Sequence, residues 1–206
     1  MNLKYILIAG VTGLGLLFFL FVENTRSSSL TNYPPKNERI VAFGDSLVQG
    51  YGATEGHDFV SILGTKLGRE IVNLGRSGDT TMDGVLRMDE VVEEAPGTVV
   101  LLLGGNDYLR RMEESVSREN LSMLIRTFQE EGAVVVLLGV RGGIILDGRE
   151  EMYDDLSKEY GTVYIDDVLR GVFNKPEYMF DGIHPNDAGY ALIADRLYEV
   201  FREYNL

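Results

Sequence analysis

Five short stretches of uninterrupted apolar residues, separated by longer amphipathic stretches, constrain the fold of this chain more than any other feature. A strand that is buried on both faces has such an unbroken apolar pattern, and its alternation with helices is typical of a parallel sheet. We therefore predict an α/β protein, a three-layer α/β/α sandwich with a central, mostly parallel five-stranded sheet. The expected strands are residues 40–43, 71–74, 99–103, 134–138 and 163–165. The expected helices are residues 58–67, 83–93, 115–131, 149–160 and 186–204.

The N-terminal part of the chain has a different composition. Residues 5–22 are eighteen uncharged, mostly apolar residues, and a helix of that length would span about 27 Å, close to the hydrocarbon thickness of a bilayer. We expect residues 1–22 to form a transmembrane anchor, with a cleavable signal segment as the alternative. Residues 23–38 are expected to be a polar linker, and residues 39–206 the folded domain.

The position of Lys4 before this apolar segment favours a cytoplasmic N-terminus. The folded domain is then expected outside the cytoplasmic membrane, attached to it by the single N-terminal helix, or secreted if the segment is cleaved. The formal net charge of -13 makes nucleic acid an unexpected partner, since a phosphate backbone would repel such a surface. Oligomeric state has no signature in the sequence.

The absence of cysteine excludes disulfides, thiolate metal sites and a cysteine nucleophile. The chain contains only two histidines, His57 and His184, so any imidazole chemistry must use one of them. His57 opens an expected helix and is interpreted as a surface or capping residue. His184 follows Asp181 by three residues in a short turn, where the carboxylate could accept from the imidazole and orient it as a base. A helix-capping turn is the alternative for this pair.

Parallel sheets bind their ligands beyond the carboxyl ends of their strands. The first expected strand is followed by Gly44-Asp45-Ser46-Leu47, which would hold the Ser46 hydroxyl out of the sheet, although such a serine can also be a simple helix N-cap. The second strand is followed by Gly75, a candidate backbone N–H donor or a plain turn. The third is followed by Asn106, whose side-chain amide could stabilise an oxyanion, or which could simply adopt a turn conformation.

These segments together place a nucleophile, three potential oxyanion donors and an oriented base at one edge of one sheet. The three donors are the N–H groups of Ser46 and Gly75 and the Asn106 amide. Other polar residues nearby receive a structural interpretation. Asp45 is expected to brace the turn and Asp107 to shape its loop, while Ser77 is a possible decoy nucleophile.

The four segments occur in the order found in the SGNH hydrolases, or GDSL family, which this chain resembles. The strings GDSLVQGYG, NLGRSGDTT, LGGND and DGIHPN are similar to the arylesterase, thioesterase and lysophospholipase branch of that family. The resemblance implies a flavodoxin-like fold and a serine esterase without metal or cofactor, acting on small or lipid-like acyl esters or thioesters. It implies the catalytic residues Ser46, His184 and Asp181, and an oxyanion hole formed by Ser46, Gly75 and Asn106.

Two other functions are compatible with these residues. A carbohydrate O-acetylesterase acting on cell-envelope glycans would use the same catalytic set, although the lack of tryptophan disfavours sugar stacking. A non-catalytic, membrane-tethered binding module could keep the fold without turnover. Two apolar groups could form the lip of an acyl site or pack locally. They are Tyr108, Leu109 and Met112, and Ile144, Ile145 and Leu146.

Overall fold

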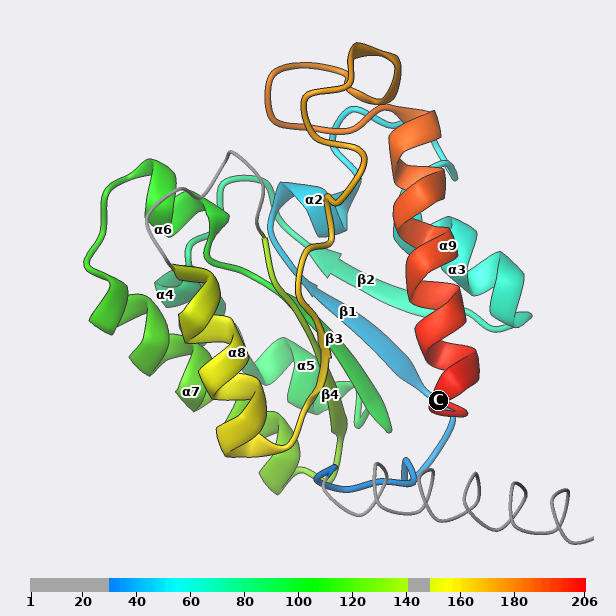
Figure 1. Ribbon diagram of the computed structural model, residues 1–206. Helices are drawn as coiled ribbons and strands as arrows, with labels where there is room; N and C mark the ends of the chain where they lie inside the picture. Colours follow the sequence, from blue (N-terminus) through cyan, green and yellow to red (C-terminus); the bar gives the residue numbers. More distant parts are fainter. Residues whose placement is uncertain (1–29, 141–148) are drawn as a thin grey trace, which may run out of the picture.

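The computed structural model describes residues 30–140 and 149–206, which form an α/β sandwich around a five-stranded sheet (Figure 1). The strand order is β2-β1-β3-β4-β5, and every ladder is parallel. The strands are β1 Ile40–Gly44, β2 Ile71–Gly75, β3 Thr98–Leu102, β4 Val134–Leu138 and β5 Val163–Ile165. All five lie within one residue of the expected ranges, and the predicted parallel α/β architecture is confirmed.

Helices cover both faces of the sheet (Figure 1). Helices α3 and α9 pack against each other on one face, and α4, α7 and α8 lie on the other. The helices are α2 Ser46–Gln49, α3 Phe59–Leu67, α4 Thr81–Leu86, α5 Asp89–Glu93, α6 Gly105–Leu109, α7 Glu114–Glu130, α8 Arg149–Tyr160 and α9 Asp187–Glu203, with the 3-10 turn η1 Pro176–Tyr178 before α9.

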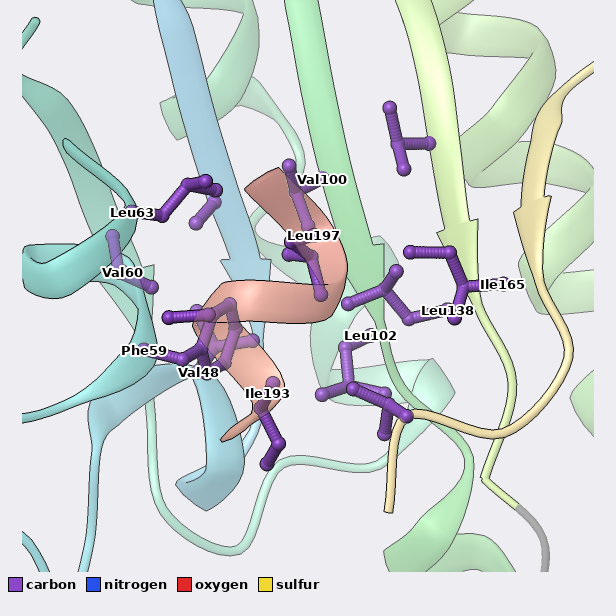
Figure 2. Close-up of a cluster of buried hydrophobic side chains, with 14 of the residues drawn as sticks. Val48, Phe59, Val60, Leu63, Val100, Leu102, Leu138, Ile165, Ile193 and Leu197 are labelled. Carbon is purple, nitrogen blue, oxygen red and sulfur yellow. The ribbon is translucent and has the colours of Figure 1, made fainter. Parts of the chain in front are cut away.

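Alternate residues of each central strand face opposite layers, which explains why the apolar runs are unbroken. In β3, Val100 and Leu102 enter the core beneath α3 and α9, whereas Val99 and Leu101 enter the core beneath α7 and α8. Figure 2 shows the first of these cores, in which side chains from three strands meet those of α3 and α9. This double burial fixes the sheet and therefore the loops at its carboxyl edge.

The expected helix over residues 83–93 is wrong, because the chain forms two short helices there. The capping box between Thr80 and Asp83 starts α4 two residues early. Arg87 then leaves the helical conformation, with φ of -127°, and α5 begins at Asp89. This break directs the Arg87 guanidinium to the carboxyl ends of β1 and β2, where it donates to a backbone carbonyl of each strand and to Asp79.

Residues 30–38 were expected to belong to the linker, but they pack on the domain. The N–H of Thr31 donates to Gly161 O at 2.9 Å, and the Asn37 side chain donates to Ala95 O at 3.1 Å. Leu30 and Tyr33 pack against the core. The folded domain therefore includes residues 30–38. The expected anchor, residues 1–22, lies outside the described residues, and within 30–140 and 149–206 no helix has the length and apolarity needed to cross a bilayer.

Candidate active site

The turn between β1 and α2 presents Ser46 at the carboxyl edge of the sheet. Ser46 is the first residue of α2, and Asp45 caps this helix by accepting from Leu47 N at 3.0 Å. A Cβ on Gly44 would lie 2.2 Å from Leu102 O, so only glycine permits the close approach of this turn to β3. Asp45 therefore braces the turn, as expected, and the Ser46 side chain is left half-buried at the surface.

The turn before α9 places His184 against this serine. His184 Nε2 lies 3.0 Å from Ser46 Oγ, and His184 Nδ1 lies 2.8 Å from Asp181 Oδ2. A carboxylate can only accept, so this geometry fixes the proton on Nδ1 and leaves Nε2 to accept from the serine. An antiparallel bridge between Met179 and Pro185 closes the turn that carries both residues.

Asp181 is held by backbone donors as well as by the imidazole. Its Oδ1 accepts from the N–H groups of Ile183 and His184, both at 2.7 Å. Partial burial would raise the pKa of Asp181, but these donors and the imidazole outweigh it and hold that pKa below its usual range. The carboxylate is therefore ionised at neutral pH and can stabilise a protonated His184.

Hydrogen bonds away from Ser46 and His184 connect the segment that follows Ser46 to the start of α9, which follows His184. Thr54 donates to the Asp187 carboxylate through its N–H and its hydroxyl, both at 2.7 Å. The hydroxyl of the buried Tyr190 donates to Tyr51 O at 2.8 Å. Because Asp187 and Tyr190 belong to α9, this helix fixes both loops relative to each other.

Asn106 points its amide toward the same region. It lies in α6, and its Nδ2 donates to Asp79 O at 2.9 Å, which orients the amide and leaves its second N–H for another acceptor. One pocket connects Asn106 to Ser46 and His184. Its described lining residues are Asp45, Ser46, Leu47, Gly105, Asn106, Leu109, Val140, Ile183 and His184.

Gly75 does not join this arrangement. Its N–H donates to Asn73 Oδ1 at 2.9 Å, so that donor is already engaged. A Cβ on Gly75 would lie 2.1 Å from Gln49 N, which shows that the glycine serves the packing of β2 against α2. The expected role of Gly75 as an oxyanion donor therefore lacks support from the geometry.

Gly78 is a better-placed glycine that the sequence interpretation missed. It has a φ of +87°, and its carbonyl accepts from Arg110 Nη2 at 2.7 Å. The next residue, Asp79, is the backbone partner of Asn106. No hydrogen bond among the described residues occupies the Gly78 N–H. The only signal in the sequence was a second glycine three residues after Gly75, and the N–H groups of Arg76, Ser77 and Asp79 in the same turn are all engaged.

Buried hydrogen bonds of Asp107 and Asn120 connect α6 to the neighbouring helices. Asp107 is fully buried, and its carboxylate accepts from Thr81 N at 2.9 Å, from Thr81 Oγ1 at 2.5 Å and from Ser117 Oγ at 3.1 Å. Asn120 donates to Thr81 Oγ1 at 3.0 Å. These bonds join α4, α6 and α7, so Asp107 has the structural role expected of it and holds its neighbour Asn106 in place.

Arg87 is the second residue that sequence interpretation missed. It is buried, and its guanidinium donates to Gly44 O and Leu74 O, both at 2.9 Å, and to Asp79 Oδ2 at 2.6 Å. It thus joins the ends of β1 and β2 to the loop that orients Asn106. Nothing in the sequence distinguishes Arg87 from a solvent-exposed helical arginine.

Of the remaining candidates in the described part of the chain, only Leu109 lines the pocket that contains Ser46 and His184. His57 is exposed, and its Nδ1 lies 3.1 Å from Thr54 Oγ1, which agrees with its interpretation as a surface residue. Ser77 is also exposed. Leu109 lines the pocket, whereas Tyr108 packs against the core. Ile144, Ile145 and Leu146 lie outside the described residues.

The arrangement of these loops matches known proteins. Residues 42–192 match the family described as GDSL-like Lipase/Acylhydrolase, which is most of the folded domain. The chain belongs to this family. The GDSL-family chain is 31% identical over 171 residues to an arylesterase of Vibrio mimicus, covering 77% of this chain and 86% of that protein.

Two further proteins extend the comparison of this GDSL-family chain. It is 28% identical over 167 residues to thioesterase 1/protease 1/lysophospholipase L1 of Escherichia coli strain K12, covering 77% of this chain and 80% of that protein. A crystal structure of TesA superposes with a TM-score of 0.75 at 28% identity, covering 80% of this chain and 98% of that one. The family match over residues 42–192 includes the β1 turn and the Asn106 loop, and together with these relatives it supports an ester-hydrolysing enzyme.

Asp45 gives this GDSL-family domain an unusual pH dependence of stability. Burial, together with the nearby carboxylates of Asp79 and Asp107, raises the pKa of Asp45 to about 7. The folded state therefore keeps a proton that the unfolded chain releases above its ordinary pKa of about 4. The contribution of Asp45 to the free energy of unfolding is therefore complete below pH 4. It is lost as the pH rises from about 4 to about 7.

The variant Asp45→Asn tests this linkage, because its amide does not titrate and can still accept from Leu47 N. We expect its free energy of unfolding, relative to the wild type, to rise by roughly 2–4 kcal/mol between pH 4.5 and pH 8. Urea unfolding of both proteins at each pH provides the measurement. A difference that stays constant over this range would mean that Asp45 is ionised throughout.

Proposed function

We propose that this chain is a serine esterase that hydrolyses carboxylic esters or thioesters of small or lipid-like acyl groups through an acyl-enzyme. The observation that carries the proposal is the continuous contact from Asp181 through His184 to Ser46, with separations of 2.8 Å and 3.0 Å. The names of its relatives, an arylesterase and a thioesterase/protease/lysophospholipase, support the same class of substrate.

In the proposed first step, the Ser46 oxygen bonds to the acyl carbon while its proton passes to His184 Nε2. The carbonyl oxygen becomes an oxyanion, and the ionised Asp181 stabilises the imidazolium. His184 then returns the proton to the leaving oxygen or sulfur as its bond to carbon breaks. A water molecule releases the acid by the same steps in the second half-reaction.

The oxyanion is proposed to accept from the Ser46 N–H, from the Asn106 amide and from the Gly78 N–H. Ser46 N begins α2 and has no hydrogen-bond partner among the described residues, as is normal for a helix N-terminus. Asn106 and Gly78 are joined through Asp79, so their donors can be held together. Gly78 replaces Gly75 in this proposal because the Gly75 N–H is engaged by Asn73.

Asn106→Ala is expected to lower kcat by roughly 10²–10³-fold, because one charge-stabilising donor is lost in the transition state. The Michaelis constant should change little, since a neutral substrate carbonyl gains less from this donor than an oxyanion does. Steady-state kinetics with p-nitrophenyl acetate measure both values. An unchanged kcat in a folded variant would exclude Asn106 from the oxyanion hole.

The proposal as a whole is tested by a fluorophosphonate probe, which reacts only with an activated serine. Stoichiometric labelling that maps to the peptide containing Ser46 is expected; no labelling would refute a serine esterase and favour a binding module. Hydrolysis of p-nitrophenyl esters of increasing acyl-chain length then distinguishes the proposed esterase function from the alternative O-acetylesterase function. Activity on longer acyl chains favours the proposed esterase, and activity restricted to acetate favours the carbohydrate O-acetylesterase.

We also propose that residues 1–22 anchor the domain to the cytoplasmic membrane, with the domain on its outer side. The basis is the apolar composition of residues 5–22, and residues 23–29 then remain as the linker. Sequencing the N-terminus of the mature protein tests retention of the anchor. Protease added to spheroplasts, in which only the cytoplasmic membrane protects proteins, should release the domain, and protection of the domain there would contradict the proposed orientation.

A further inference from the structure

Two exposed aromatic rings stand beside His184. The Tyr51 ring lies 4.6 Å from the imidazole, centroid to centroid, and the Phe180 ring lies edge-on to Tyr51 at 6.0 Å. Tyr51 is 48% exposed and Phe180 is 60% exposed. Neither is among the described residues that line the pocket between His184 and Asn106. Large apolar groups exposed together at such a position indicate a binding surface.

Backbone hydrogen bonds fix the positions from which both rings project. Tyr51 N donates to Ser46 O at 2.9 Å, and the Tyr51 carbonyl accepts from buried Tyr190. Phe180 N donates to His184 O at 2.8 Å. Gly52, with φ of +94°, makes room for the pair, because a Cβ there would lie 2.9 Å from Phe180 Cβ. The two rings therefore form a preformed shelf, fixed to the same turns that carry Ser46 and His184.

The geometry of acyl transfer determines which part of a substrate would contact Tyr51 and Phe180. His184 Nε2 must reach the leaving oxygen to protonate it, so the group attached to that oxygen emerges beside the imidazole. If Asn106 stabilises the oxyanion as proposed, the carbonyl oxygen would point toward Asn106. The apolar residues Leu109 and Val140 in the same pocket would then contact the acyl chain.

We propose that Tyr51 and Phe180 form a leaving-group subsite that selects esters of aromatic alcohols. An aromatic leaving group would stack on or meet the edge of these rings at the separations that aromatic pairs prefer. The inference rests on the proposed esterase function. It adds that the enzyme selects its substrate by the leaving group. Tyr51 and Phe180 are specificity-determining residues, whereas proton transfer stays with His184.

The test compares benzyl acetate with ethyl acetate, which share the acyl group and both release an alcohol. For Phe180→Ala, the ratio of kcat/KM for benzyl over ethyl acetate is expected to fall about fivefold to tenfold, the effect of losing an aromatic contact. Tyr51→Leu should lower the same ratio, and Tyr51→Phe should preserve it because the ring remains. An unchanged ratio in Phe180→Ala would overturn the proposal.

Leu109→Ala is the matched control, since Leu109 is similarly exposed but lines the acyl pocket. It should leave the benzyl-to-ethyl ratio unchanged and instead lower the preference for butyrate over acetate esters. An equal loss with both acetates in Phe180→Ala, with slower fluorophosphonate labelling of Ser46, would show that Phe180 only positions His184, and would also overturn the proposal. Absence of labelling in the wild type would refute the esterase function itself, a distinguishable result.

Discussion

Ser46→Ala is expected to lower kcat by roughly 10⁶-fold, the loss seen when the nucleophile of a serine triad is removed. The variant keeps Asn106, the α2 N-terminus and the Asp181–His184 pair, so residual catalysis above the uncatalysed rate should persist. Folding should be unaffected, because Ser46 is half-buried and the helix cap is supplied by Asp45. Hydrolysis of p-nitrophenyl esters and fluorophosphonate labelling measure the effect.

Ser77→Ala is the matched control for this variant. Ser77 is an exposed serine on a neighbouring loop at the same edge of the sheet, and its N–H contact to Gln49 Oε1 does not involve the side chain. Its kcat and labelling should equal those of the wild type. A Ser46→Ala protein that keeps a hundredth or more of the wild-type kcat would contradict the role proposed for Ser46.

Arg87→Met should lower the free energy of unfolding by about 3–5 kcal/mol, the cost of removing one partner of a buried ion pair. The substitution keeps the apolar stem but removes the donor to the Asp79 carboxylate and to the Leu74 carbonyl, and one of the two donors to the Gly44 carbonyl, which still accepts from Arg76 N. Urea denaturation at pH 7 measures the loss. Asp79→Asn in the same chain should restore part of it, because the unpaired charge is then removed.

Arg202→Met serves as the control for Arg87. Arg202 and its partner Glu199 are both mostly exposed, with 3.7 Å between Nη1 and Oε2. Such surface pairs contribute little, and the variant should stay within about 0.5 kcal/mol of the wild type. Equal losses in the two variants would show that burial of Arg87 does not matter to stability.

The strands could be predicted from sequence because each is buried on both faces. Uninterrupted runs such as 134–138 leave little choice of structure, and that strand has the expected bounds. Ser46 and Asn106 could be proposed from sequence because each follows a parallel strand, and such strands deliver their following loops to one edge. Asp181 and His184 were proposed from their spacing and from the scarcity of histidine. The structure brings Ser46, His184 and Asp181 into contact, while their catalytic roles stay predictions.

The features missed from sequence depend on contacts between distant segments. The break at Arg87 is fixed by carbonyls of β1 and β2, and residues 30–38 look like a linker until their donors meet Ala95 and Gly161. The choice between Gly75 and Gly78 was missed for a different reason, because it depends on a local hydrogen bond. The Asn73 side chain, two residues earlier, accepts from the Gly75 N–H. The residue types alone do not show that this bond forms.

The contacts between α9 and the segment that follows Ser46 have a consequence for local unfolding. Thr54 and Tyr51 are held by Asp187 and Tyr190, which lie in α9. The turn that carries His184 leads directly into the same helix. Unfolding of α9 would therefore release both sides of the 3.0 Å contact between Ser46 and His184 in one step.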